Sequence, residues 1–189
     1  MAARVRLSAM PLDPMPRPPE RPIDTLPELV AELLRQDPPA AYGSVLQRYA
    51  VPIRLLEPYF RWSPRHYTRT CVERNAAFEL LVVCYGPGQR TSIHDYDSET
   101  AWVHPVMGEV VEERYVRHAG SGVLQLVQET RLRPGMLGAL TRESSIHRFI
   151  NPGPDPAVTL NLYAPPMSKW RVYDQRTGST SVEPAGPPA

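Results

Sequence analysis

The stretch GPGQRTSIHDYDSETAWVHPVMG, residues 86–108, decides the fold. Five residues separate Gly88 from His94, Tyr96 follows two positions after His94, and gaps of four and six residues lead to Ala101 and Gly108. Side chains at positions i and i+2 of a strand point to the same side of it. A strand here therefore predicts His94 and Tyr96 on one face, where two ligands of one metal ion would lie.

A second motif, which also has a glycine turn followed by a histidine, occurs later in the chain. It has the turn sequence RPG at 133–135, then His147 and, after three further residues, Asn151. An imidazole from a facing strand would complete a facial triad that leaves positions on the metal open for substrate and dioxygen. We therefore predict a metal site made by His94 and His147, with Tyr96 at the third ligand position.

The other three histidines do not join this set. If Ala101 faces inward, Val103 does too, and the alternation of a strand then turns His104 outward. His66 and His118 belong to no constellation, so we interpret them as surface or loop residues.

Composition limits the classes of partner. The chain has 189 residues, is 42% hydrophobic, and carries a net charge of +1 with no concentration of basic residues. This disfavours nucleic acid as a partner, and no window has the roughly 20 apolar residues of a membrane span. Cys71 and Cys84 lie in segments that favour strands, and the N-terminus lacks a signal-peptide pattern. We expect a reduced, cytoplasmic protein that is a monomer or a weak homo-oligomer.

The chain divides into three parts. Residues 1–23 form a proline-rich arm that we expect to be irregular, residues 24–178 form one domain, and residues 179–189 form a polar, proline-rich tail. The domain begins with a predicted helix from Thr25, which has capping-box spacing with Glu28, to about Gln36, and a second short helix over 40–49. Short β-rich runs then favour an all-β barrel or sandwich; they cover 78–85, 101–107, 110–116, 123–132, 136–141, 147–150, 158–164 and 169–174.

Five segments keep their order over about residues 42–178, and they are HYTRT (66–70), GPGQRTSIHD (86–95), SSIHRFIN (144–151), VTLNLYAPP (158–166) and YDQRTG (173–178). Together they resemble the cysteine dioxygenase type I family. The resemblance implies a cupin fold, which is a jelly-roll-like β-barrel, here with a short helical N-terminal segment. It also implies an Fe(II) cofactor and oxidation of the thiol of free cysteine by O2 to a sulfinic acid. The two motifs above are then the two cupin motifs.

The resemblance also assigns roles to residues. His94 and His147 would bind iron, Arg69 would bind the substrate carboxylate, and Tyr67 and Tyr163 would contact substrate or dioxygen as catalytic and substrate-binding residues. A planar guanidinium can indeed bind a carboxylate through two hydrogen bonds, which lysine cannot. Without the resemblance, Arg69 would be interpreted as part of a surface salt bridge and Tyr163 as a core or rim residue. The arginine favours cysteine over 3-mercaptopropionate, the substrate of neighbouring thiol dioxygenases.

Three positions depart from the family pattern. Tyr96 replaces the second histidine ligand. The supporting Ser-His-Tyr series of the family appears as Thr159, Asn161 and Tyr163, and an amide cannot carry a proton at neutral pH. Ala101 stands where animal members have a cysteine that cross-links to the active-site tyrosine, so this thioether cannot form here.

Tyr96 leaves two hypotheses for the function. A neutral phenol is a poor ligand, whereas a phenolate formed next to the metal would favour iron(III) over iron(II). Asp95 points away on strand alternation, although Asp97 and Glu99 could approach if the loop bends. The first hypothesis is an iron-dependent thiol dioxygenase. The second is a catalytically impaired cupin that binds or senses a small molecule, and a cupin with another metal or reaction is a third, weaker option.

Overall fold

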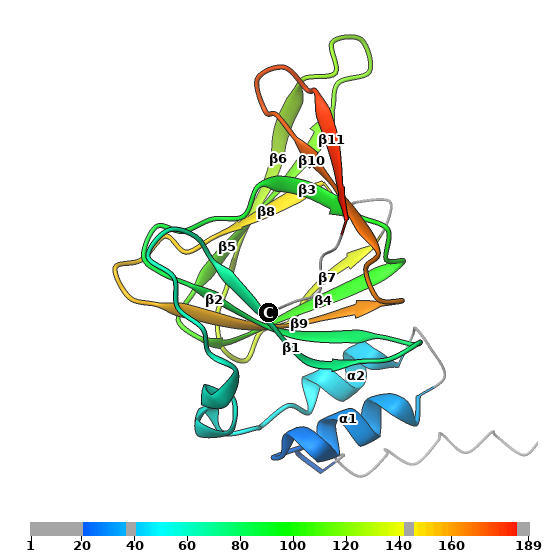
Figure 1. Cartoon of the computed structure of the whole chain (residues 1–189), viewed down its shortest axis with the longest axis vertical. Coiled ribbons are helices and arrows are strands. Elements are labelled where there is room, and N and C mark those ends of the chain that lie inside the picture. Colours follow the sequence, from blue (N-terminus) through cyan, green and yellow to red (C-terminus); the bar gives the residue numbers. More distant parts are fainter. Residues whose placement is uncertain (1–20, 37–40, 142–145, 185–189) are drawn as a thin grey trace, which may run out of the picture.

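The computed structural model describes residues 21–36, 41–141 and 146–184. Two antiparallel sheets face each other, one with the strand order β1-β2-β9-β4-β7 and one with β11-β10-β3-β8-β5-β6 (Figure 1). The strands are β1 (Thr68–Arg74), β2 (Glu79–Tyr85), β3 (Ile93–Tyr96), β4 (Thr100–Met107), β5 (Val110–Arg117), β6 (Leu124–Leu132), β7 (Gly138–Thr141), β8 (His147–Ile150), β9 (Ala157–Ala164), β10 (Lys169–Tyr173) and β11 (Thr180–Pro184).

The order of the strands along the chain identifies the architecture. From β2 onward the chain passes repeatedly from one sheet to the other, with β5–β6 and β10–β11 as hairpins within the second sheet. This is the cupin jelly roll, so the predicted all-β fold class is confirmed.

The central strands of the first sheet are buried on both faces. Along β2 and β9, even-numbered side chains lie in a core beneath the helices, and odd-numbered side chains lie between the two sheets. Covering both faces explains why residues 80–85 form a continuous apolar run instead of an alternating one. The same alternation places Thr159, Asn161 and Tyr163 on the inner face of β9.

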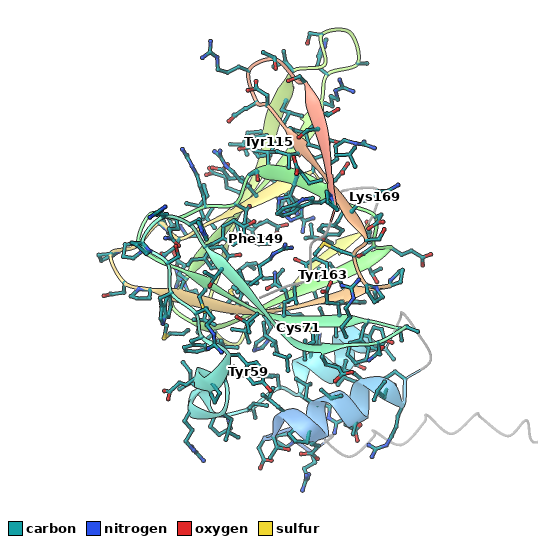
Figure 2. The ribbon with its side chains drawn as sticks, viewed as in Figure 1. Tyr59, Cys71, Tyr115, Phe149, Tyr163 and Lys169 are labelled. Carbon is teal, nitrogen blue, oxygen red and sulfur yellow. The ribbon has the colours of Figure 1, made fainter. Side chains whose placement is uncertain are left out.

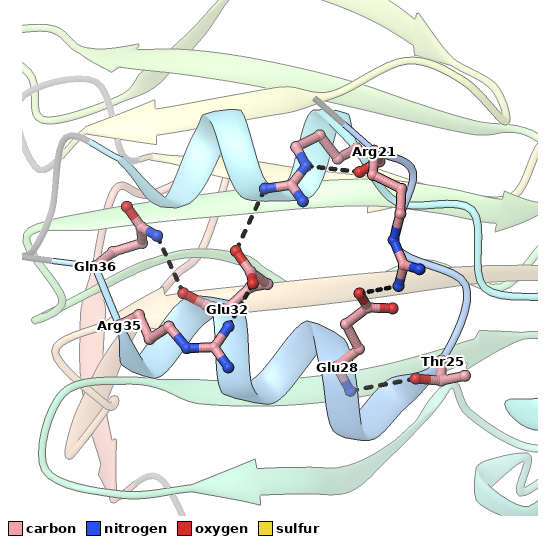
Figure 3. Close-up of polar contacts among 7 residues, drawn as sticks. Arg21, Thr25, Glu28, Glu32, Arg35 and Gln36 are labelled. Atoms are coloured by element: carbon pink, nitrogen blue, oxygen red, sulfur yellow. Dashed lines mark hydrogen bonds and ion pairs between the residues drawn. The ribbon is translucent and has the colours of Figure 1, made fainter. Parts of the chain in front are cut away.

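Two helices cover the outer face of the first sheet (Figure 1). They are α1 (Leu26–Leu34) and α2 (Tyr42–Gln47), and the 3-10 turns η1 (Ile53–Leu55) and η2 (Glu57–Tyr59) follow them. Both predicted helices are present but shorter than predicted. Thr25 caps α1 by accepting a hydrogen bond from the Glu28 amide at 3.3 Å. Figure 3 shows this cap and the carboxylate of Glu32, which accepts from Arg35 and from Arg48.

The ends of the domain differ from the prediction. Ile23, inside the predicted arm, is fully buried and forms a β-bridge with Tyr49. Residues 180–184, inside the predicted tail, form β11, which pairs with β10 across the boundary that we placed at Gly178. β11 is an exposed edge strand held by backbone pairing, so its sequence lacks the apolar alternation that would reveal it. Residues 1–20 and 185–189 lie outside the described residues. No helix in the described ranges is long and apolar enough to span a membrane.

Candidate metal and substrate site

The three predicted metal-binding residues lie together on the inner face of the second sheet. His94 on β3 is directly opposite His147 on β8, and their ring centroids are 4.5 Å apart. The ring of Tyr96 lies 5.5 Å from that of His147 and 6.2 Å from that of His94. With metal–nitrogen bonds of about 2 Å, two imidazoles at right angles on one ion have centroids roughly 4.5 Å apart. The observed spacing therefore suits a shared ion.

His94 is prepared to act as a neutral nitrogen ligand. Its Nδ1 lies 2.9 Å from the Ser92 carbonyl oxygen, which can only accept, so Nδ1 carries the proton and Nε2 keeps its lone pair. Burial, with a smaller contribution from the nearby charge of Arg69, lowers the pKa of His94 to about 4. This pattern, in which the second ring nitrogen donates to a carbonyl, is usual for metal-binding histidines.

Tyr96 places a buried hydroxyl beside these rings. The side chain is 5% exposed, and its oxygen has no hydrogen-bond partner within 21–36, 41–141 and 146–184. Burial raises the pKa of Tyr96 well above its ordinary value, so without a cation the phenol is neutral. A buried oxygen that lacks a partner is costly, and a cation would relieve that cost. Two imidazoles and this oxygen therefore fit a divalent ion such as iron(II).

No carboxylate substitutes for the third histidine in the described part of the chain. Asp95 accepts a hydrogen bond from the Tyr173 hydroxyl at 2.7 Å, Asp97 accepts from the Ser168 amide at 3.0 Å, and Glu99 is exposed. Within the described ranges no three His, Cys, Asp or Glu side chains come together as a metal cluster. The third donor on this face is therefore the Tyr96 oxygen.

The remaining histidines lie where strand alternation predicts. Val103 belongs to the core between the sheets, whereas His104 faces outward and packs against Tyr49 at 4.7 Å between ring centroids. His66 and His118 are exposed outside the strands. None of the three can reach the ion position.

A cavity opens beside His94 between the two sheets. The cavity is small, with about 20 Å³ open to the centre of a water molecule. Figure 2 shows Phe149 from β8 and Tyr163 from β9 extending into the space between the sheets. The lining residues are Tyr67, Arg69, Val83, Tyr85, Thr91, His94, Phe149, Asn161, Tyr163, Met167 and Trp170.

Arg69 is the cation of this cavity. Its guanidinium carbon lies 4.7 Å from the centroid of the Trp170 ring. It forms no ion pair with any residue that the structure describes, so the salt-bridge interpretation finds no acidic partner there. A half-buried guanidinium without a counterion, in the same cavity as a buried neutral imidazole, can bind a small anion.

The supporting series on β9 is hydrogen-bonded. The Thr159 hydroxyl donates to Asn161 Oδ1 at 2.7 Å, and Asn161 Nδ2 donates to the Tyr163 hydroxyl at 3.2 Å. Burial raises the pKa of Tyr163, although the Asn161 bond and the Arg69 charge oppose this rise. Tyr67 stacks on Tyr85 with ring centroids 5.7 Å apart, and burial raises its pKa too. Tyr67 and Tyr163 are therefore neutral hydroxyls.

The last residues of the two motifs, Gly108 and Asn151, have structural roles. Gly108 has φ of +67°, and a Cβ there would lie 2.7 Å from the Pro156 carbonyl oxygen, so only glycine fits. Asn151 Nδ2 donates to the carbonyl oxygens of Tyr85 and Asp155 and thereby ties the end of β8 to the end of β2. These residues shape the site without lining it.

Several lining residues escaped the sequence analysis, above all Trp170. It lies inside a predicted strand whose residues 169–172 alternate polar and apolar, which indicates that Trp170 faces inward but not which residues it contacts. Thr91, whose hydroxyl accepts from the Phe149 amide, and the apolar Val83, Phe149 and Met167 carry no chemical signature of a site.

Comparison with known proteins agrees with this geometry. The family model "Cysteine dioxygenase type I" matches residues 40–176. Cysteine dioxygenase type 1 of Homo sapiens is 30% identical over 123 residues, which cover 64% of this chain and 62% of that protein. The Danio rerio protein is 31% identical over 125 residues with the same coverage. The chain thus matches about three fifths of the length of these relatives.

The fold also has a solved counterpart. The crystal structure of TT1209 from Thermus thermophilus superposes with a TM-score of 0.50 at 22% identity and covers 59% of this chain and 94% of that protein. That likeness concerns the fold alone. The family model, by contrast, covers well over half of the chain and includes every residue of the site described above. The chain therefore belongs to the cysteine dioxygenase type I family.

Proposed function

We propose that this protein is an iron-dependent thiol dioxygenase that oxidises a small thiol carrying a carboxylate, most readily cysteine, to its sulfinic acid. The reaction R–SH + O2 → R–SO2H balances because both oxygen atoms end on sulfur. One observation carries the proposal: Arg69, a cation without an acidic partner among the described residues, lies in the same cavity as His94. Membership of the cysteine dioxygenase type I family supports it.

The residues divide the work between binding metal and binding substrate. His94, His147 and Tyr96 would hold Fe(II), which supplies the redox chemistry with dioxygen and the attraction for a thiolate. Arg69 would bind the carboxylate through two N–H donors at the edge of its guanidinium. The thiol end of the substrate is thereby directed toward the histidines.

Tyr163 would act as a hydrogen-bond donor in the cavity. Since Asn161 Nδ2 donates to its oxygen, the hydroxyl proton of Tyr163 is not used in that bond and remains free to donate. Asn161 orients the tyrosine but cannot relay a proton, because an amide does not titrate near neutral pH. Tyr67, held by stacking on Tyr85, would contact the substrate from the same wall.

The second candidate is a binding or sensing cupin without turnover. Tyr96 favours it, because a neutral buried phenol leaves a site with two nitrogen ligands and low metal affinity. The two candidates share the cavity and the carboxylate site, and they differ in whether oxygen is consumed. A cytoplasmic location and a monomeric or weakly homo-oligomeric state also remain predictions for either candidate.

One experiment separates the candidates. The purified protein is loaded with iron(II) under nitrogen, its iron content is measured, and oxygen uptake is followed with cysteine and with 3-mercaptopropionate. The dioxygenase proposal expects uptake with cysteine and formation of one sulfinate per O2. Full iron loading without oxygen uptake would refute it, and saturable binding of cysteine in that case would favour the second candidate.

A further inference from the structure

The indole of Trp170 contacts both Arg69, the proposed carboxylate-binding residue, and His94, a proposed metal-binding residue. Its ring lies under the Arg69 guanidinium, with the guanidinium carbon 4.7 Å from the ring centroid. The indole also forms an edge-type contact with the ring of His94, with ring centroids 5.3 Å apart at an interplanar angle of 64°. Because the indole is rigid, its two contacts set the distance between the Arg69 guanidinium and the His94 ring.

The indole contacts Arg69 but offers it no hydrogen-bond acceptor. A cation over the centre of an indole is attracted through the face of the ring, and a guanidinium has its N–H donors around its edge. Trp170 thus restrains Arg69 without using the donors that a carboxylate needs. No acidic side chain among the described residues restrains Arg69 instead, so the aromatic ring takes the place that a counterion often fills.

The nitrogen of the indole is itself unsatisfied. Trp170 Nε1 is buried and has no hydrogen-bond acceptor among the residues that the structure describes. An indole N–H can only donate, and a buried donor without an acceptor costs free energy. The other side chains that line the cavity include no carboxylate. An acceptor for this N–H can therefore come with a bound anion.

We propose that Trp170 is a substrate-positioning residue that also contacts the substrate: its ring orients Arg69, and its N–H donates to the substrate carboxylate. This inference rests on the proposed function for the nature of the substrate. It also assigns specificity, because the indole fixes the span between Arg69 and His94. Thiols with a carboxylate at that span bind, and thiols without a carboxylate gain nothing from Trp170.

Three variants separate the two tasks of the indole. Trp170→Phe keeps a ring under Arg69 and removes the N–H, whereas Trp170→Leu removes both. Trp62→Phe is the matched control, since Trp62 is half exposed and its ring contact is with Phe60, away from the cavity lining. The substrates are cysteine and 2-aminoethanethiol, which is cysteine without its carboxylate. KM and kcat are measured by oxygen uptake with iron-loaded protein.

The expected results depend on the substrate. Trp170→Phe raises KM for cysteine roughly tenfold with little change in kcat, because one hydrogen bond to a charged group is lost. Trp170→Leu raises KM for cysteine further. In both variants KM for 2-aminoethanethiol stays within about twofold of the wild-type value. Trp62→Phe changes neither. Equal losses for both substrates, or a normal KM for cysteine in Trp170→Phe, would overturn the inference.

The test also distinguishes failure of the inference from failure of the proposed function. If wild-type protein consumes no oxygen, the dioxygenase proposal fails, and the same variants are then compared by calorimetric binding of cysteine and 2-aminoethanethiol. The inference still expects a roughly tenfold weaker binding of cysteine to Trp170→Phe. If Trp170→Leu does not fold, Trp170→Phe alone decides the outcome.

Discussion

Replacement of Arg69 by lysine is the perturbation that best isolates the carboxylate site. Lysine keeps the positive charge but has no planar fork, so it cannot form two parallel hydrogen bonds to a carboxylate. It also loses the cation–π contact of the guanidinium, whose central carbon lies 4.7 Å from the centroid of the Trp170 ring. Because Arg69 has no acidic partner among the described residues, its replacement should disturb substrate binding far more than folding.

The size of the effect follows from these two losses. A hydrogen bond to a charged group contributes about 1.5–3 kcal/mol, and the cation–π contact contributes about 0.5–1 kcal/mol. The lysine charge recovers part of this through a single hydrogen bond. A net loss of about 2–3 kcal/mol corresponds to a fall in kcat/KM for cysteine of roughly 30- to 150-fold, mostly through KM.

The assay compares two substrates and two variants. Oxygen uptake is measured with cysteine and with 2-aminoethanethiol for Arg69→Lys and for Arg65→Lys, an exposed arginine outside the cavity lining. We expect the loss for cysteine in Arg69→Lys alone, and thermal unfolding close to that of wild type in both. A similar loss for 2-aminoethanethiol would refute the reasoning, because that substrate has no carboxylate.

Four further predictions test the metal face and the fold. Tyr96→His should raise iron affinity about tenfold or more, measured as iron retained after dialysis, and should increase oxygen uptake; unchanged iron content would contradict ligation at this position. A ferric-phenolate absorption band in oxidised protein should disappear in Tyr96→Phe, and its persistence would assign the band elsewhere. Gly108→Ala should lower the free energy of unfolding in urea by about 1–2 kcal/mol or more, because its φ is +67° and the new Cβ would meet Pro156. Gly153→Ala, with a nearest contact of 3.6 Å, is the control, and equal losses in both would count against this steric cause. Burial lowers the pKa of His104 in the folded protein, so as the pH falls the unfolded state binds a proton before the folded state does. The free energy of unfolding should therefore decrease as the pH drops below about 6.5. His104→Asn should make the urea midpoint less dependent on pH in this range. An identical pH dependence in that variant would show that other groups cause it.

The parts of the site that follow from local geometry could be predicted. The two-residue period of a strand places His94 and Tyr96 on one face, turns His104 outward, and aligns Thr159 with Tyr163. The order of short apolar runs also predicts the fold class. These predictions depend on the spacing of residues within a strand, which the sequence states directly.

The parts that depend on how strands meet could not be predicted. Trp170 reaches Arg69 only because β10 pairs with β3 in one sheet while β1 lies in the other. Its residue type and spacing do not indicate that contact. β11 is polar and exposed, and backbone hydrogen bonds to β10 define it, so side-chain periodicity does not reveal it. The Tyr96 hydroxyl lies in a ligand position, but its ionisation depends on a nearby cation as well as on sequence.

The proposed function requires that a thiol bound through its carboxylate to Arg69 is oxidised in this cavity. It can be tested by measuring oxygen consumption and sulfinate formation by fully iron-loaded wild-type protein with cysteine, in parallel with Arg69→Lys. We expect one cysteine sulfinate to form per O2 consumed, with a rate at low substrate that falls at least roughly 30-fold in the variant. Full iron loading without sulfinate, or sulfinate formation that does not depend on Arg69, would contradict it.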